Sequence, residues 1–278
     1  MPYTHRPPCP GLRDVVERIG IQEAPAAAEP APPTRILPTG TTELVFQYAD
    51  AFVDGLEHPS ESPRACIAGQ RSAPSFTRAT GRTGLVIVML APWGLSALLG
   101  DAARQLDRAF ADLADLLPAG ALHPLQDTLD RATSAEVRIA AVERFLLSLR
   151  SAEADPVARA AIALMHTGTP RVDEIAGHLD LGVRQFERRF RAAVGLSPKR
   201  FGRILRLQRA IGQLRCGHGA ADAAAASGFY DQPQFQRDCL ALTGLTPGSL
   251  LAAVGRTPLT RAYNDQAMSR FYNTMFLH

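Results

Sequence analysis

Residues 172–201 read VDEIAGHLDLGVRQFERRFRAAVGLSPKRF, and residues 221–250 read ADAAAASGFYDQPQFQRDCLALTGLTPGSL. The two stretches align at an offset of 49 residues, with a phenylalanine, an arginine, a glycine and a proline recurring at matching places. Internal similarity of this kind indicates two copies of one supersecondary unit. Each copy is predicted to be a short helix, a turn and a second helix that ends before Gly-x-x-Pro. We call the two stretches copy one and copy two.

The second helix of copy one is expected to bury one face and to expose a basic one. Phe186, Phe190 and Val194 are spaced by four and fall on one face, whereas arginines occupy the others. In the first helix, small Ala176, which the alignment pairs with Ala225, allows the two helices to approach closely. The major groove of DNA admits one α-helix, so the exposed basic face suits that groove.

Two arginines of this helix are the leading candidates for reading bases. Arg184 and Arg188 lie one turn apart near its start, and arginine best matches the paired acceptors of guanine. A solvated helix face is the structural alternative for both. In copy two the equivalent surface is rich in glutamine, which can pair with adenine. The residues predicted to contact DNA are Val183, Arg184, Gln185, Glu187, Arg188, Arg191, Lys199, Arg200, Gln232, Gln234, Gln236 and Arg237. Phosphate contacts or salt bridges are expected of Arg189, Arg200, Arg203 and Arg206.

Positive charge is concentrated around copy one. The 278-residue chain has a net charge of only +3, but residues 172–215 hold ten Lys and Arg against four acids. This segment therefore carries +6 and the remainder sums to −3. Copy two is acidic, with Arg237 against Asp222, Asp231 and Asp238. Because phosphate neutralisation supplies much of the affinity for DNA, copy two is predicted to bind weakly.

The length favours two domains, and the pattern changes along the chain suggest where they lie. A Pro/Ala segment at 22–34 predicts a poorly ordered leader. Short β-favouring runs at 42–48, 64–68 and 84–90 predict a small β-rich module, and helical spacing over 122–149 predicts helices that close it. The predicted fold is a leader over 1–34, an α+β sensor or oligomerisation domain over 35–150, an all-α double helix-turn-helix domain over 156–254 with a long joining helix, and a tail over 255–278.

Several classes of protein are not expected from this sequence. No apolar run reaches the ~20 residues of a membrane span, and residues 1–21 lack a secretory signal, so a cytoplasmic protein is predicted. Neither metal nor cofactor is expected, because His58, His123 and His166 share no ligand spacing and no CxxC pair occurs. The chain lacks G-x-S-x-G, H-E-x-x-H, Walker and Rossmann motifs, so no enzyme is predicted. Free thiols are expected of Cys9, Cys66, Cys216 and Cys239.

The double unit resembles the DNA-binding domain of the AraC/XylS family of transcriptional regulators. The motifs that carry the resemblance are E-I-A at 174–176, F-E-R-R-F at 186–190, V-G-L-S-P at 194–198, R-L-x-x-A at 206–210, G-F-Y-D at 228–231, F-Q-R at 235–237 and T-G-L-T-P at 243–247. The resemblance implies recognition helices at 183–191 and 232–240, with a connecting helix at 198–214. It further implies that both recognition helices enter successive segments of the major groove on one face of the DNA.

Copy two departs from the family pattern, and the N-terminal half matches it less specifically. The first helix of copy two is mostly alanine where the family has a bulky aliphatic residue, and Cys239 stands where an aromatic is usual. Residues 36–46, Gly69 and the P-W-G at 92–94 resemble small β-rich sensor-like domains, which bind an effector, mediate dimerisation, or both. Phe46 and Trp93 are candidates for a ligand pocket, with ordinary core packing as the alternative.

These patterns predict a sequence-specific regulator of transcription, an activator or a repressor, that binds double-stranded DNA. RNA polymerase, a small-molecule effector and a second copy of the chain are left open as further partners. The alternative is a degenerate helix-turn-helix protein that serves as a protein-interaction module without specific DNA binding.

Overall fold

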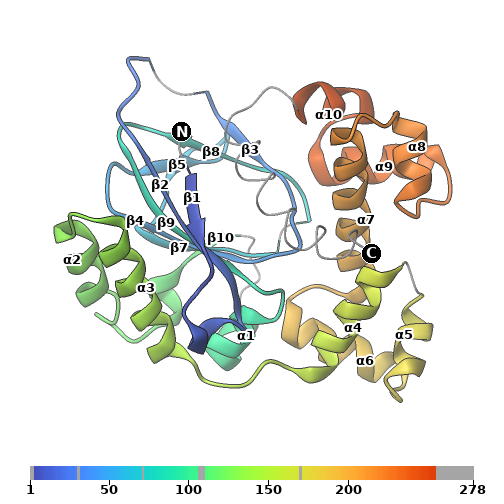
Figure 1. The fold of residues 1–278 in the computed structure, drawn as a ribbon, viewed down its shortest axis with the longest axis horizontal. Helices are drawn as coiled ribbons and strands as arrows, with labels where there is room; N and C mark the ends of the chain where they lie inside the picture. Colours follow the sequence, from blue (N-terminus) through green and yellow to red (C-terminus); the bar gives the residue numbers. More distant parts are fainter. Residues whose placement is uncertain (1–2, 30–31, 71, 106–109, 169–170, 255–278) are drawn as a thin grey trace.

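The computed structural model describes residues 3–29, 32–70, 72–105, 110–168 and 171–254. It has two parts that lie side by side (Figure 1). The N-terminal part holds two β-sheets with covering helices, and the C-terminal part holds helices alone. The predicted fold class, a β-rich N-terminal domain followed by an all-α region, is confirmed.

A six-stranded antiparallel sheet forms the larger layer of the N-terminal part, in the order β1-β2-β9-β4-β7-β10. Three of its strands confirm the β-favouring runs identified from the sequence, namely β4, β7 and β9. The strands are β1 (Tyr3–Arg6), β2 (Val16–Ala24), β4 (Glu43–Gln47), β7 (Ala65–Ala68), β9 (Thr83–Leu90) and β10 (Phe110–Asp112). Because successive side chains of a strand face opposite sides, this sheet can serve two environments at once.

The prediction of a poorly ordered leader over 1–34 is wrong for most of the described segment. β1 pairs with β2, and β2 pairs along its length with β9 inside the sheet. Val16, Ile19 and Ile21 are buried there. Apolar residues recurring through β2 drive this burial, and residues 25–29 and 32–33 of the Pro/Ala segment are exposed.

A smaller sheet with the order β3-β8-β5-β6 lies opposite the larger one. Its strands pair antiparallel throughout, with Arg35 opposite Phe76 and Phe52 opposite Ala79. The strands are β3 (Thr34–Ile36), β5 (Phe52–Asp54), β6 (Ser60–Glu61) and β8 (Ser75–Ala79).

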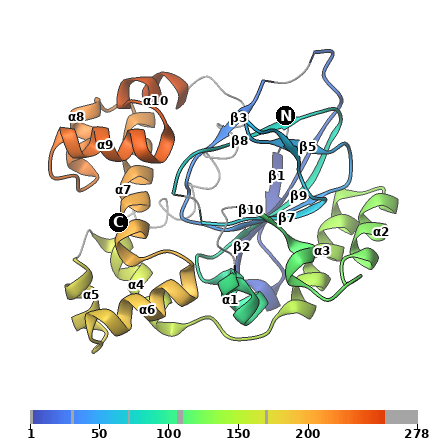
Figure 2. The same ribbon diagram turned by 180° about the vertical axis from the view of Figure 1, so that it is seen from behind.

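Helices cover the outer face of the larger sheet (Figures 1 and 2). The predicted helical stretch at 122–149 is two helices, α2 (His123–Arg131) and α3 (Ala135–Leu149). The hydroxyl of Ser134 caps α3 by accepting from the Val137 amide. One apolar core joins this face to the helices, and the rings of Phe46 and Phe145 meet edge-on at 6.0 Å in it. The remaining elements are η1 (Pro10–Leu12), α1 (Gly94–Leu99), η2 (Gly100–Gln105) and η3 (Leu113–Leu116).

The C-terminal part begins after a short link, residues 150–155, that joins α3 to α4. Asp155 caps α4 by accepting from the amides of Val157 and Ala158. The long helix α7 runs between copy one and copy two (Figure 1). The elements are α4 (Pro156–Thr167), α5 (Val172–His178), α6 (Val183–Val194), α7 (Pro198–Arg215), α8 (Ala220–Ala226), α9 (Gln232–Thr243) and α10 (Pro247–Val254). The predicted tail at 255–278 lies outside the described residues.

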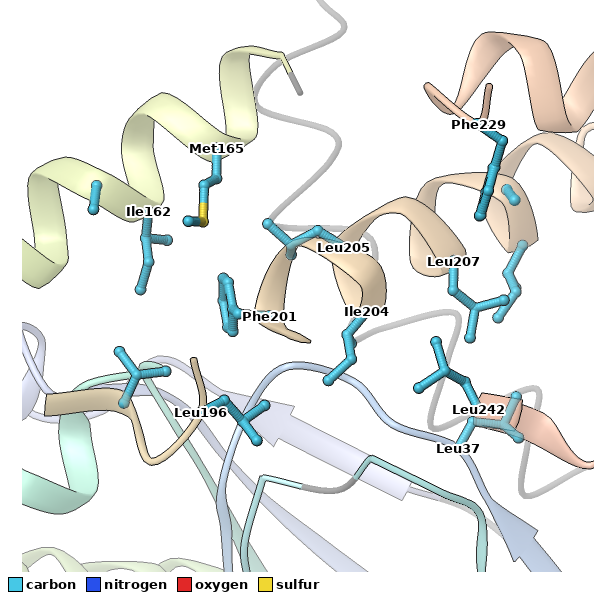
Figure 3. Packing of buried hydrophobic residues seen from close by; sticks show 14 of the residues in the cluster. Leu37, Ile162, Met165, Leu196, Phe201, Ile204, Leu205, Leu207, Phe229 and Leu242 are labelled. Atoms are coloured by element: carbon cyan, nitrogen blue, oxygen red, sulfur yellow. The ribbon is translucent and has the colours of Figure 1, made fainter. Parts of the chain in front are cut away.

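One hydrophobic cluster runs through both copies and reaches into the N-terminal part (Figure 3). Leu37, just after β3, is buried in it near Ile204 of α7 and Leu242 of α9. Trp93, at the start of α1, packs against the same cluster. The two parts of the molecule therefore share a core.

Candidate nucleic-acid interface and internal cavity

Helix α6 exposes the basic face that the sequence predicts. Phe186 and Phe190 are completely buried, and Phe190 meets Phe201 of α7 at a ring-centroid distance of 5.7 Å. The opposite face is exposed and includes Val183, Arg184, Gln185, Glu187, Arg188 and Arg191. Among the described residues, Arg184, Arg188 and Arg191 make no ion pair with an acidic side chain. Their charges are therefore available to a partner.

The other cations of this region are used differently. The guanidinium of Arg189 donates to Asp155 at 2.8 Å, and Arg203 holds Asp238 with two contacts at 3.0 and 2.8 Å. Arg209 donates to the Gly168 carbonyl at 3.0 Å. These side chains stabilise the domain. At the start of α7, Lys199 and Arg200 are exposed, as a phosphate contact requires.

Arg206 lies beneath copy two and is also internal. Its Nη2 atom is 3.9 Å from the carboxylate of Asp238, and its guanidinium lies 5.7 Å from the ring centroid of Phe229. Burial lowers the pKa of Arg206, the negative charge of Asp238 opposes that shift, and the charges of Arg203 and Arg209 add to it. Of the two roles expected for Arg203 and Arg206, the structure shows the salt bridge for both.

The alignment of the two copies needs one correction. The second helices α6 and α9 are offset by 49 residues, but the first helices α5 and α8 are offset by 48. The turn amides confirm the shorter offset, because Leu181 donates to Ala176 and Phe229 donates to Ala224. Ala224, and not Ala225, is thus the structural partner of Ala176, and both are buried.

The extra residue of copy two is Tyr230, which lies between Phe229 and the N-cap Asp231 of α9. Its side chain is 94% exposed, beside the start of α9. The extra residue leaves the buried ring of Phe229 in the position of Leu181 and places the tyrosine outside. The sequence signal for this extra residue was that the first helices of the two copies are one residue closer in offset than the second helices.

Helix α9 presents a surface with little charge. Gln232, Gln236 and Arg237 are exposed, and Arg237 is its only cation. Gln234 is half-buried, and its side-chain oxygen accepts from the backbone amide of Tyr230 at 2.8 Å. The backbone amide of Gln234 donates to the Asp231 carboxylate at 2.6 Å. This reciprocal cap fixes the start of α9, and it uses the side-chain oxygen of Gln234.

A cavity of about 510 Å³ lies between the two sheets of the N-terminal part. Its floor comes from the larger sheet, on the face away from α2 and α3, and includes Val45, Leu85 and Ile87. Its other walls come from β3, β5, β6 and β8. The polar residues that line it include Gln22, Arg35, Glu43, Gln47 and Asp54. Mostly apolar walls with a few polar groups are typical of sites for small organic molecules.

Neither aromatic residue predicted to line a ligand pocket lines this cavity. Phe46 is buried on the opposite face of the sheet, against α3, because it is one residue out of step with Val45 and Gln47. The indole of Trp93 donates to the Asp14 carbonyl at 2.8 Å and packs at the junction with the helical part. The aromatic residues that do line the cavity are Phe52, Phe76 and Phe110.

Glu17 and His166 have strongly shifted pKa values and lie outside the cavity walls. Burial raises the pKa of Glu17 to about 8, against the opposing charge of Arg18. Burial, together with the positive charge of Arg209, lowers the pKa of His166 to about 4. Within the described residues, no group of three His, Cys, Asp or Glu side chains is arranged to hold a metal ion. No helix in that part of the chain has both the length and the apolar character needed to cross a bilayer.

The two parts of the chain match two protein-family models. Residues 175–253 match a model described as a helix-turn-helix domain, and residues 4–112 match one described as a domain of unknown function, DUF6597. A comparison with curated proteins found no match.

Among solved structures, the chain is similar to a Chromobacterium violaceum transcriptional regulator described among AraC-type DNA-binding domain-containing proteins. Identity is 27% over 37% of this chain and 95% of that chain, with a TM-score of 0.35. ToxT from Vibrio cholerae O395 is 10% identical over 85% of this chain and 99% of that chain, with a TM-score of 0.46. The AraC-like transcriptional activator CuxR is 16% identical over 76% and 87%, with a TM-score of 0.30.

Proposed function

We propose that this chain, which carries a C-terminal helix-turn-helix domain of the AraC type and a separate N-terminal β-rich domain, regulates transcription by reading a specific DNA sequence mainly through α6. The observation that carries this proposal is the row of exposed arginines on α6, Arg184, Arg188 and Arg191. Arg189 on α6 and Arg203 on α7 are instead held in ion pairs, so only some of the arginines of this region are available to a partner. Exposed arginine on a helix with a buried phenylalanine face is suited to reading guanine in a major groove.

The length of α7 supports a role for both copies on one duplex. An 18-residue helix spans about 27 Å, which is close to the ~34 Å repeat of B-DNA. Copy two is the weaker reader in this proposal, because α9 offers glutamines and one arginine where α6 offers several arginines. Phosphate neutralisation, which provides most non-specific affinity, falls to copy one and to the start of α7.

The cavity of the N-terminal part is the proposed effector site. Its volume of about 510 Å³ lies within the ~300–1,000 Å³ that is common for small-molecule pockets. Gln22 and Gln47 would orient a bound molecule, and the apolar walls would provide most of the binding free energy. Contact with RNA polymerase and pairing of two copies stay predictions from the family resemblance.

DNA binding is tested with duplexes enriched by the purified protein from a random pool, and with scrambled duplexes of the same composition. At two salt concentrations, Arg184→Ala and Arg188→Ala are each expected to weaken binding to the enriched duplex by about 5- to 150-fold, the equivalent of ~1–3 kcal/mol per base contact. Arg144→Ala, an exposed arginine on α3, is the matched control and leaves affinity unchanged. Equal and negligible binding to both duplexes would reject the regulator and favour the protein-interaction module.

Effector binding is tested by thermal denaturation against a set of small amphipathic molecules. A ligand that occupies the cavity raises the unfolding temperature of the wild type. Thr77→Trp, which places an indole at the cavity wall, abolishes that rise, whereas Arg78→Trp on the exposed side of the same strand preserves it. A rise that survives Thr77→Trp would place the ligand elsewhere.

A further inference from the structure

The N-terminal part contacts both recognition helices near their C-terminal ends. In α9 the carbonyl of Thr243 accepts from Nη1 of Arg35 at 2.7 Å. In α6 the carbonyl of Ala193 lies 3.0 Å from the hydroxyl of Ser96 in α1, which also lies 2.8 Å from the Trp93 carbonyl. The two contacts come from different elements, β3 and α1.

The contact with α9 belongs to the cavity wall. Arg35 lines the cavity, and its guanidinium lies 4.7 Å from the ring centroid of Phe76, another wall residue and its partner across the β3–β8 pair. The residues after Arg35 continue the attachment, because Leu37 is buried beside α7 and α9 and the Pro38 carbonyl accepts from Gln208 of α7. The strand that encloses the cavity is therefore the strand that holds copy two.

Helix α9 has no cation of its own at its C-terminal end, and Arg35 provides one. The carbonyl end of a helix favours a nearby cation. Helix α6 has Arg191 in its last turn, but α9 has no basic residue there, and Leu240 stands at the position equivalent to Arg191. Arg35 is 208 residues away in the chain and supplies this cation from the other domain.

Glycine at 244 permits the approach. Gly244 has a φ of +68°, and a Cβ atom built on it would lie 2.7 Å from Nη1 of Arg35. Gly195 ends α6 in the same left-handed conformation, with a φ of +84°, but nothing lies within 4 Å of a Cβ built there. The contact with α6 is also separate from the cavity, since no residue of α1 lines it.

We propose that Arg35 is a positioning residue that ties the second recognition helix to the cavity wall, so that filling the cavity releases copy two and leaves copy one in place. An occupant that pushes the β3–β8 pair outward moves Arg35 and Phe76 together and removes the cation from the end of α9. This inference rests on the proposed function for its consequence at DNA. The tie itself can be measured without DNA.

The test is amide hydrogen exchange on the full chain, followed in peptides that cover the ends of α9 and α6. Arg35→Ala is expected to speed exchange in the last turn of α9 by about tenfold, as loss of a hydrogen bond from a charged donor implies, with no change in α6. Gly244→Ala has the same effect by displacing the guanidinium. Gly195→Ala carries the same left-handed backbone cost without a collision and does not affect α9.

Filling of the cavity is tested in the same assay. Thr77→Trp is expected to speed exchange at the end of α9 and not of α6, and Arg78→Trp is the matched control with no effect. The amphipathic dye 1-anilinonaphthalene-8-sulfonate should speed exchange at the end of α9 in the wild type, provided that its fluorescence shows binding that Thr77→Trp abolishes.

Three outcomes overturn the proposal. They are unchanged exchange in Arg35→Ala, equal acceleration in α6 and α9, and an α9 that responds to Arg35→Ala but not to Thr77→Trp. The last outcome would make the tie a fixed structural contact. Failure of the proposed function is separate, because it appears as absent DNA binding while the exchange pattern is preserved.

Discussion

Copy one and copy two have the same helix-turn-helix plan but divide its physical tasks differently. Copy one packs a chain of phenylalanines, Phe186, Phe190 and Phe201, and leaves three of the arginines of α6 exposed. Copy two has an alanine first helix, one pair of rings, Phe229 and Phe235, and an outer face with little charge. An ion pair with α7 and a hydrogen bond from Arg35 hold its second helix. The difference shows that a repeated unit can keep its fold while one copy relies on its neighbours.

The largest expected effect on the free energy of unfolding comes from removing a phenylalanine from the core of copy one. Phe190→Ala removes a completely buried ring between two others and should lower the free energy of unfolding by about 3–5 kcal/mol. Phe235→Ala should lie at the lower end of that range, because alanine helix α8 can move toward the space left. Denaturant unfolding measures both, with exposed Val137→Ala as the control below about 0.5 kcal/mol. A larger loss from Phe235→Ala would contradict the comparison.

The next effect concerns the ion pairs of copy two. Asp238→Ala leaves Arg203 and Arg206 without their shared carboxylate and should lower the free energy of unfolding by about 2–3 kcal/mol. The double variant Arg203→Met with Asp238→Leu should recover part of that loss, because it removes one of the two guanidiniums that Asp238→Ala leaves unpaired. A double variant no more stable than Asp238→Ala would show that the carboxylate mainly serves Arg206.

Lowering the pH should destabilise the helices around copy one more than those of copy two. His166, at the end of α4, is neutral when folded because its pKa is lowered to about 4, whereas His218 near copy two is exposed. The stability that neutral His166 provides is present above its unfolded pKa of about 6.5 and is lost as pH falls from there toward 4. The loss should be on the order of 2 kcal/mol. His166→Gln should flatten the pH dependence of thermal unfolding, and an unchanged profile would remove this role.

The smallest expected effect on stability comes from giving α9 the basic residue that α6 has in its last turn. Leu240→Arg places a cation in the last turn of α9, where α6 has Arg191, and should stabilise the helix by about 0.3–1 kcal/mol. It should also reduce the response of α9 to Arg35→Ala. Leu240→Gln removes the exposed apolar side chain without adding charge and separates the two effects in the same unfolding assay. Equal stabilisation by both variants would show that charge is not the cause.

Local patterns predicted the helical part well and the N-terminal part only partly. The spacing of Phe186 and Phe190 defined the buried face of α6, and that face is where the structure has it. The strands β1 and β2 were missed because the proline-rich segment dominated the pattern, although Val16, Ile19 and Ile21 signalled a buried strand. Phe46 was misplaced as a cavity residue because the sequence does not show which face of a sheet a helix will cover. Trp93, at the start of α1, packs at the junction with the helical part, and no local pattern specifies that contact.

The sequence by itself determined the two repeated units, the buried phenylalanine face of α6 and its exposed arginines, because helical periodicity depends only on neighbouring residues. Tertiary structure alone decided the rest. The cavity needs two sheets to meet, and the contact of Arg35 with the end of α9 joins residues 208 positions apart. Such contacts depend on how whole layers pack, and no local pattern specifies that packing.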